Sequence, residues 1–387
     1  MDTAPNHSER TSNSSSPTEN DEDDESILLP GLPDHLAQLC LSTLHPSLLY
    51  AVCRPWRRLL YSPCCPPFFS LYALLSSTSP ASAANRQYSN SVEFLSLDPV
   101  SSAWRQLPSP PSDPPLRLLH RHPSFISWNL PIQSVTASGR LVLIAATTDH
   151  FLPALSCPLV FDPLSNSNHW FSGPPLAAPR RWCAAGSIGG AVYVASGVGS
   201  HYQGDVARSV EKWNMNMKDK EWFWEKMAGL KDGRFSREAV AAIGYRGKLC
   251  MVNVKGNAIK QGGVYNVAVN QWEDMPEGML AGWNGPAAAT MDGGEEMYVV
   301  DEANGVLSKY DPNNDTWEML VESAEHLKGA EQIAAGRGRV CVVCANGRQI
   351  VVVDVVARPT RTWVVNPPLG MEVISVHILP RMNQLSE

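Results

Sequence analysis

Few residues in this sequence have the types and spacing that catalysis or metal binding requires. Cys341 and Cys344 form a CxxC pair, and His120 and His122 lie in a long proline-rich stretch. A zinc site usually needs four ligands, and neither pair has further ligands at a suitable spacing. The signatures GxSxG, HExxH and the P-loop are absent. We therefore predict no catalytic residue, no metal and no cofactor.

The distribution of charge argues against broad binding to nucleic acid. Residues 1–26 contain eight acidic side chains and one basic side chain, so they hold the whole net charge of −7. The remaining residues are neutral overall, whereas nucleic-acid binding needs a concentrated basic surface. The same acidic segment has almost no apolar side chains to bury, which predicts that it is disordered.

Cysteine usage and hydropathy predict an intracellular protein, in the nucleus, the cytoplasm or both. Most of the nine cysteines lie in apolar runs, as expected of small buried side chains in a reducing compartment. The chain opens without a secretory signal, and it has no run of about 18 apolar residues that could cross a membrane. We expect no membrane association.

Residues 28–61 have the proline and leucine spacing of three short helices. Pro33 and Asp34 suit a helix start. Backbone N–H groups in the first turn have no helical partner, so the missing N–H of proline costs nothing there, and an aspartate side chain accepts hydrogen bonds from the others. Pro46 and Pro55 are expected near the starts of the second and third helices. The predicted apolar face of the first helix comprises Leu36, Leu39, Cys40 and Leu44.

A tryptophan repeat occupies the rest of the chain. Six tryptophans recur at intervals of 45 to 66 residues, each shortly after an apolar strand and a turn. Small-residue strands and glycine-introduced apolar strands precede most of them, so each repeat predicts four short antiparallel strands. Such a unit cannot bury both faces alone, but units arranged radially pack on their neighbours. The repeat tryptophans are Trp104, Trp170, Trp224, Trp272, Trp317 and Trp363.

The repeats predict a mostly β fold, a propeller of six blades, with five or seven blades as alternatives. The first blade lacks one strand, and the apolar segment 371–379 could complete it and close the ring. Small residues in the first strand of each blade suit a crowded inner edge near the axis. The tryptophan of each fourth strand is expected to pack between blades.

Two parts of the chain resemble known families. Residues 32–36 (LPDHL) and 52–59 (VCRPWRRL) resemble the opening and the second half of an F-box. The double glycine at 189–190, followed by an apolar strand with a tyrosine and later a tryptophan, resembles a kelch repeat. The whole chain resembles the plant F-box/kelch-repeat proteins. Its expected parts are a disordered acidic tail over 1–26, a small all-α F-box over 27–65 and a kelch-type β-propeller over 66–380.

This resemblance implies a substrate-recognition adaptor of an SCF-type (Skp–cullin–F-box) ubiquitin ligase rather than an enzyme. In such proteins the F-box binds a Skp-type linker, which joins a cullin, and the propeller binds the protein to be ubiquitinated. We expect about half of the candidate linker-binding residues, and Trp56 above all, to pack inside the helical cluster instead. The candidates are Leu32, Pro33, Leu36, Leu39, Leu44, Leu48, Val52, Cys53 and Trp56.

The resemblance also implies that loops on one face of the propeller bind the target, whose identity the sequence does not reveal. Arginine and aromatic side chains in these loops suit an interface, and an arginine cluster suits an acidic or phosphorylated target. Trp182 and Trp283 could equally pack between blades. The candidate target-binding residues are Arg180, Arg181, Trp182, Tyr202, Arg234, Phe235 and Trp283.

Two other functions are compatible with the sequence. A kelch scaffold with a degenerate F-box would act outside any ligase, and no cullin would be recovered with it. A propeller enzyme, such as a copper oxidase or a sugar isomerase, would assemble its site from scattered loops and would be revealed by bound metal.

Overall fold

A computed structural model divides the chain into two compact units, Met1–Pro66 and Pro67–Glu387. The predicted disordered tail at 1–26 lies outside the residues that the structure describes. The described residues are 28–42, 44, 46–60, 69–77, 89–98, 102–112, 116–119, 132–148, 152–165, 169–201, 204–217, 221–236, 240–253, 259–291 and 294–382.

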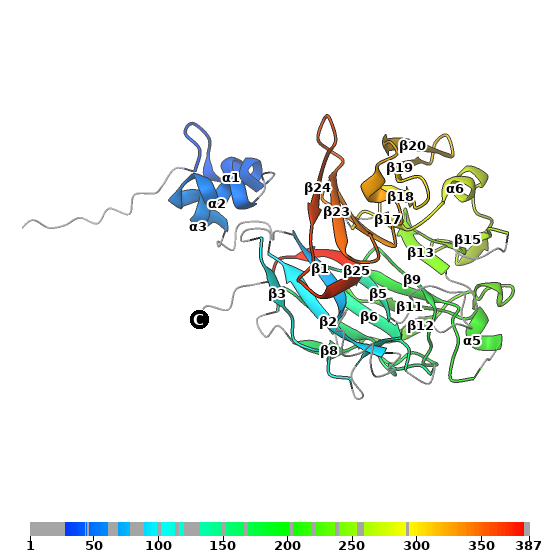
Figure 1. The fold of residues 1–387 in the computed structure, drawn as a ribbon. Helices are drawn as coiled ribbons and strands as arrows, with labels where there is room; N and C mark the ends of the chain where they lie inside the picture. The colour runs from blue at the N-terminus through cyan, green and yellow to red at the C-terminus, as the bar shows by residue number, and fades with distance from the viewer. Residues whose placement is uncertain are drawn as a thin grey trace, which may run out of the picture. The chain divides into compact units, whose positions relative to one another are not determined.

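The first unit contains three short helices, which confirms the helical prediction (blue in Figure 1). They are α1 (Asp34–Ser42), α2 (Pro46–Val52) and α3 (Arg54–Leu60). Pro55 lies in the first turn of α3, where a missing N–H removes no helical hydrogen bond. The helices pack around a small apolar core, because a few side chains on each helix point inward. The buried core residues are Ala37, Leu41, Leu49, Leu59 and Leu60.

The second unit is a six-bladed β-propeller, as the repeat predicts (Figure 1). Blades two to six are consecutive antiparallel four-stranded sheets, each beginning at the innermost strand. Their strands are β5 (Ile132–Ala137), β6 (Arg140–Ala146), β7 (Leu159–Phe161) and β8 (Trp170–Ser172); β9 (Ala184–Ile188), β10 (Ala191–Ala195), β11 (Val210–Asn214) and β12 (Trp224–Lys226); β13 (Val240–Tyr245), β14 (Lys248–Asn253), β15 (Gly262–Asn266) and β16 (Gln271–Glu273); β17 (Ala287–Ala289), β18 (Met297–Asp301), β19 (Val306–Asp311) and β20 (Thr316–Val321); β21 (Gln332–Gly336), β22 (Arg339–Cys344), β23 (Gln349–Asp354) and β24 (Arg361–Val365).

The first blade joins the two ends of the propeller. Its innermost strand is the C-terminal β25 (Met371–Pro380), which pairs antiparallel with β1 (Phe69–Ser77). The blade continues through β2 (Ser89–Leu97) to β3 (Trp104–Gln106), and β4 (Arg117–Leu119) also pairs with β2. The C-terminal strand therefore closes the ring with backbone hydrogen bonds, which leaves no open edge between the first and last blades.

Short helices lie in several of the connections between strands. They include α5 (Gly204–Arg208) and α6 (Glu277–Gly282), and the 3-10 turns η2 (Arg234–Ser236) and η3 (Glu325–Leu327). None of the helices in the described part of the chain has the length and apolar character needed to span a membrane.

Glycine allows neighbouring innermost strands to approach closely near the axis. A Cβ atom on Gly244 of β13 would lie 1.8 Å from the carbonyl oxygen of Ser187 on β9. A Cβ on Gly186 of β9 would lie 2.7 Å from Leu249 and 3.1 Å from the backbone nitrogen of Gly244. Since the Ser187 backbone cannot yield by that much, only glycine fits at position 244, and a larger residue at 186 would displace the Leu249 side chain. Small residues do occupy the crowded inner edge, as predicted.

The six repeat tryptophans occupy equivalent places on the outermost strands. Each lies opposite a residue of the third strand, as Trp317 lies opposite Tyr310 and Trp272 opposite Tyr265. Five indole N–H groups donate to a backbone carbonyl in the segment that follows the outer strand of the preceding blade. These bonds are Trp104 to Asn366 (2.9 Å), Trp170 to Pro108 (2.7 Å), Trp224 to Pro174 (2.8 Å), Trp272 to Ala228 (3.0 Å) and Trp317 to Gly278 (3.1 Å).

Trp363 breaks this pattern at the seam between blades five and six. Its indole N–H has no such partner among the described residues, and 40% of the residue is exposed. The guanidinium of Arg339 lies 5.6 Å from its ring centroid instead. Tryptophans therefore tie five of the six blade pairs together, and this seam lacks that link.

Candidate protein-interaction surfaces

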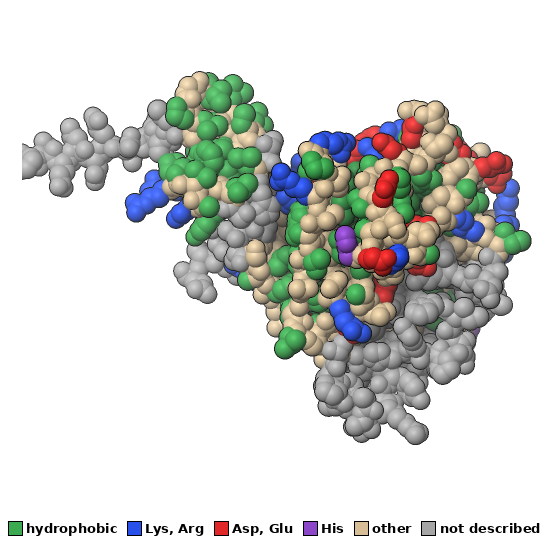
Figure 2. Space-filling view, turned by 45° about the horizontal axis from the view of Figure 1, so that its top comes forward, with side chains coloured by type: hydrophobic (Ala, Val, Ile, Leu, Met, Phe, Trp, Pro, Cys, Tyr) green, Lys and Arg blue, Asp and Glu red, His purple; other side chains and the backbone are tan. Residues whose placement is uncertain are grey.

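The helical unit carries an exposed apolar face. Leu36, Leu39, Leu48 and Val52 are 41%, 62%, 57% and 59% exposed, respectively. Figure 2 shows hydrophobic side chains gathered over the visible surface of this unit. Isolated exposed leucines are ordinary on protein surfaces, but several of them on so small a unit are typical of a contact site for another protein.

Helical geometry separates this face from the core. On α1, Ala37 and Leu41 are four residues apart and buried, so they lie on one side of the helix. Leu36 and Leu39 are three residues apart and lie on the exposed side. The helix is thus apolar on two sides, and among the described residues only one of them is buried. The second side would be covered by a partner.

Seven of the nine candidate linker-binding residues are exposed, more than the half that we expected. Cys53 and Trp56 are the two that are half-buried. The Trp56 indole N–H donates to the carbonyl oxygen of Leu28 at 2.7 Å, so this side chain ties the start of the unit to α3. The exposed seven are Leu32, Pro33, Leu36, Leu39, Leu44, Leu48 and Val52.

Arginines on α3 add positive charge to the same unit. Arg54, Arg57 and Arg58 are exposed, and Asp34 is the only acidic residue among the unit's described residues. The Arg57 guanidinium lies 4.9 Å from the centroid of the Tyr50 ring and donates to the Tyr50 carbonyl oxygen. This arrangement favours a partner that is apolar at its centre and acidic at its edge. These arginines were not among the predicted contact residues, although the run at 54–58 is visible in the sequence.

The candidate target-binding residues of the propeller do not form one surface. Arg180, Phe235 and Trp283 are 1%, 5% and 0% exposed, so their prediction as surface contacts is corrected. Phe235 and Trp283 lie in the apolar clusters between blades. Arg234 is exposed and bonded to Asp232, whose pKa it lowers to about 2 by hydrogen bonding. Tyr202 lies outside the described residues.

Arg180 is buried because it pairs with a buried acid. Its guanidinium contacts the Glu211 carboxylate and donates to Ser209 Oγ at 2.7 Å and to the Ser196 carbonyl oxygen at 3.2 Å. A buried charge needs such partners, because leaving it unpaired in a low-dielectric interior is strongly unfavourable. Arg180 therefore fastens the segment before β9 to β11.

Arg181 and Trp182 remain accessible and lie against each other. The Arg181 guanidinium is 4.4 Å from the Trp182 ring centroid, a cation–π contact. The Trp182 backbone is left-handed (φ 53°), which is unusual for a bulky side chain. Backbone strain of this kind often occurs at functional sites. Its N–H donates to Gln133 Oε1 at 3.1 Å, and Arg181 exchanges two backbone bonds of 2.9 Å with Val198.

The Arg181 guanidinium has no counter-charge among the described residues. Its Nε and Nη1 atoms are buried without a hydrogen-bond partner among the residues that the structure describes. Burial lowers the pKa of Arg181, because the charged form loses solvation. Because these two atoms are buried, an acidic or phosphorylated group on a partner would contact Arg181 at the part of its side chain that stays accessible. Arg181 and Trp182 are thus the candidate residues that best fit a target-binding role.

Across the described ranges, no group of three or more His, Cys, Asp or Glu side chains is placed to hold a metal ion. Cys341 and Cys344 are both buried and free, and burial raises the pKa of each thiol to about 12. Neutral thiols of this kind act as small apolar side chains.

Comparison with known proteins gives close and distant relatives, although no family model matches the chain. The chain is 53% identical to the F-box/kelch-repeat protein SKIP25 of Arabidopsis thaliana, over 93% of this chain and 91% of that protein. It is 25% identical to the F-box/kelch-repeat protein At1g22040 of Arabidopsis thaliana, over 79% of this chain and 73% of that protein. It is also 24% identical to the F-box protein AFR of the same plant, over 71% of this chain and 68% of that protein.

Proposed function

The chain belongs to the F-box/kelch-repeat family, and we propose that it is the substrate-recognition subunit of an SCF-type ubiquitin ligase. In this proposal the helical unit binds a Skp-type linker and through it a cullin. The propeller binds a protein target and holds it for ubiquitination. An intracellular location, in the nucleus, the cytoplasm or both, is part of the proposal.

The exposed apolar face on α1 and α2 is the observation that carries this proposal. Fully burying a leucine contributes about 1.5–3 kcal/mol, so covering four half-exposed side chains would contribute roughly 4 kcal/mol. Such a contribution is comparable to the lower estimates of the free-energy cost of the translational and rotational freedom that two proteins lose when they associate. The arginines of α3 would add attraction to an acidic edge of the partner and raise the association rate.

The subunit would contribute proximity rather than chemistry. A lysine on a bound target is held near the ubiquitin-loaded enzyme at a high effective concentration, which accelerates transfer without any catalytic residue in this chain. Arg181 and Trp182 are our candidates for target contact. The Arg181 guanidinium, which has no ion pair among the described residues, and the adjacent Trp182 ring favour a target segment that carries carboxylate or phosphate groups.

A pull-down with a purified Skp-type linker tests the proposal. The Leu36→Asp/Leu39→Asp variant should bind the linker on the order of 100-fold more weakly, because two carboxylates would be buried in an apolar contact. Leu36 and Leu39 are exposed in the free unit, so the variant should still fold. The matched control is Leu152→Asp/Leu164→Asp, which changes two leucines of the propeller that are each 42% exposed.

The control should bind as tightly as the unchanged protein. Equal linker affinity in the Leu36→Asp/Leu39→Asp variant would show that this face does not bind the linker. In a second pull-down from a cell extract, recovery of the linker without a cullin would favour a scaffold that acts outside a ligase.

A further inference from the structure

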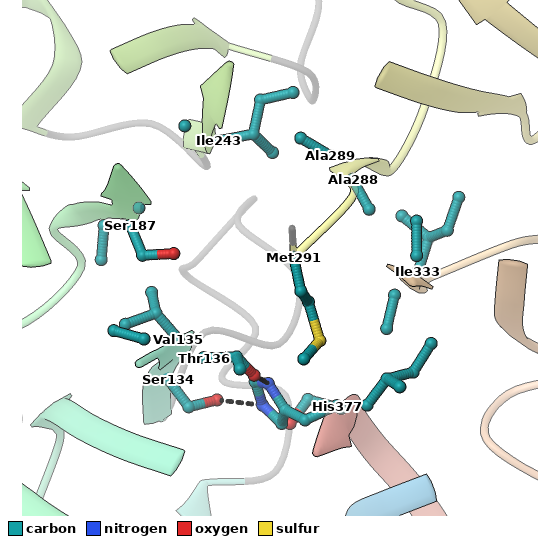
Figure 3. A pocket seen from close by; sticks show the side chains of 18 of the residues that line it. Ser134, Val135, Thr136, Ser187, Ile243, Ala288, Ala289, Met291, Ile333 and His377 are labelled. Carbon is teal, nitrogen blue, oxygen red and sulfur yellow. Dashed lines mark hydrogen bonds between the residues drawn. The ribbon is translucent and has the colours of Figure 1, made fainter. Parts of the chain in front are cut away.

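A cavity of about 640 Å³ lies where the innermost strands of all six blades face one another. Strands β25, β5, β9, β13, β17 and β21 each contribute lining residues (Figure 3). Its volume falls within the range of roughly 300–1,000 Å³ that small-molecule sites occupy. Size alone does not distinguish a binding site from a solvent channel, so the chemistry of the walls decides.

The walls of the cavity differ in polarity. His377 of β25, Ser134 and Thr136 of β5 and Ser187 of β9 place polar groups along one side (Figure 3). The opposite side is formed by β13, β17 and β21, and Met291 extends from there into the space (Figure 3). Its labelled side chains, Ile243, Ala288, Ala289 and Ile333, are all apolar, and Thr290, Glu331 and Gln332 of the same segments also line the cavity.

The polar wall keeps a spare hydrogen-bond donor. His377 Nε2 lies 2.9 Å from Ser134 Oγ, and His377 Nδ1 lies 3.1 Å from Thr136 Oγ1. Burial lowers the pKa of His377 to about 4, so the ring is neutral at pH 7 and has one donor and one acceptor. One hydroxyl therefore donates to the ring, and the other accepts from it and keeps its own hydrogen. Ser375, also in the lining, has a buried Oγ without a partner among the described residues.

The lining carries little charge. Of the described residues that line the cavity, Glu331 is the only one with a carboxylate, and none is lysine or arginine. Neutral His377 adds no charge at pH 7. A phosphate or an acidic peptide would find no counter-charge here, whereas an uncharged molecule would lose little solvation on entry.

We propose that this cavity binds an uncharged small molecule that has hydroxyl or carbonyl groups along one edge and an apolar opposite edge. The polar edge would lie against Ser134, Thr136 and His377, and the apolar edge against β13, β17 and β21. If the protein is a ligase subunit, as proposed above, this ligand could regulate target binding. Gln133 lines the cavity and accepts the N–H of Trp182, so an occupant would adjoin the candidate target-binding residues.

Prodan, an uncharged naphthalene with one ketone, is a suitable probe because its fluorescence shifts to the blue in apolar surroundings. Titration of the full-length protein with prodan should give saturable, one-to-one binding with a blue shift. The Ser134→Ala/Thr136→Val variant removes both hydroxyls with little change of shape and should bind about tenfold more weakly. Thr362→Val, which removes an exposed hydroxyl from β24, is the matched control and should bind like the unchanged protein.

Two further measurements locate the probe. Ala289→Trp fills the apolar side and should abolish saturable binding, and an unchanged unfolding curve would show that this variant folds. 2-Dimethylaminonaphthalene lacks the ketone and should bind the unchanged protein and the double variant equally. Absence of saturable prodan binding, or equal binding to the Ser134→Ala/Thr136→Val variant, would overturn the proposal. The linker pull-down does not involve this cavity. Either result would therefore leave the ligase proposal unaffected.

Discussion

Replacing Arg180 with methionine should destabilise the propeller far more than the same replacement at Arg181. The two residues are neighbours in the sequence and both suit a binding surface by residue type. Arg180 is 1% exposed and paired with Glu211, which is itself buried. Arg181 has no ion pair among the described residues and lies against Trp182. The two replacements therefore distinguish a structural arginine from a binding arginine.

The magnitude follows from what Glu211 loses. In the Arg180→Met variant, the Glu211 carboxylate would stay buried with only the N–H of Ala177, 3.1 Å from Oε2, as a partner. Removing one partner of a buried ion pair typically costs about 3–5 kcal/mol. At Arg181 the loss is one cation–π contact, worth about 0.5–1 kcal/mol. Methionine also removes the cost of burying part of a charged guanidinium, which offsets some of that loss.

Urea unfolding followed by tryptophan fluorescence provides the assay. A loss of about 3–5 kcal/mol should move the midpoint of unfolding by about 1 M or more, since slopes for proteins are on the order of 1–3 kcal/mol/M. Arg181→Met should leave the midpoint nearly unchanged. The double variant Arg180→Met/Glu211→Leu should recover most of the loss, because a well-packed apolar pair often replaces a buried ion pair without penalty.

Two results would refute this reasoning. The first is an Arg180→Met midpoint that matches that of Arg181→Met, which would mean that the buried pair contributes nothing. The second is a double variant that is no more stable than Arg180→Met alone. The cost would then come from lost packing of the arginine side chain and not from the unpaired Glu211 carboxylate.

Two further predictions concern the propeller. Trp272→Phe should lower the free energy of unfolding by about 1 kcal/mol more than Trp363→Phe, because the Trp272 indole donates across a blade seam and the Trp363 indole has no such bond among the described residues. Urea unfolding measures both losses, and equal losses would mean that the indole bonds do not hold the blades together. The pKa of His377 is lowered to about 4 by burial, so the unfolded chain binds the extra proton first as the pH falls. The contribution of His377 to the free energy of unfolding should be fully present above about pH 6.5. It should decrease by up to roughly 3 kcal/mol as the pH falls towards 4. His377→Gln should remove that part of the pH dependence in unfolding curves, and an unchanged pH profile would show that another group is responsible.

Much of the architecture could be predicted because it depends on periodic features of the sequence. The tryptophan interval gives the number of blades, and the surplus apolar segment at 371–379 indicates how the ring closes. The prolines at 33, 46 and 55 mark the helix starts. These signals are local, and each is repeated or reinforced by its neighbours. The short helices α5 and α6 could not be predicted, since five or six residues show no helical period.

Side-chain roles were harder to predict because they depend on contacts distant in sequence. Arg180 is buried by Glu211, which is 31 residues away, and no local pattern around either residue announces the pair. Trp283 is fully buried, although its segment is rich in glycine and looks like a surface loop. Residue type identifies an arginine that could bind, but burial decides whether its charge is already used within the fold.

The cavity could not be predicted either, because its polar wall combines residues that are far apart in the sequence. Ser134 and Thr136 lie in an ordinary alternating strand, and His377 lies 241 residues beyond Thr136 in the strand that closes the ring. Only closure brings them together, so the polar wall exists because the first blade is built from both ends of the propeller. A chain that ended before β25 would lose both the pairing with β1 and the imidazole of this wall. Ring closure and the chemistry of the cavity are therefore properties of the same strand.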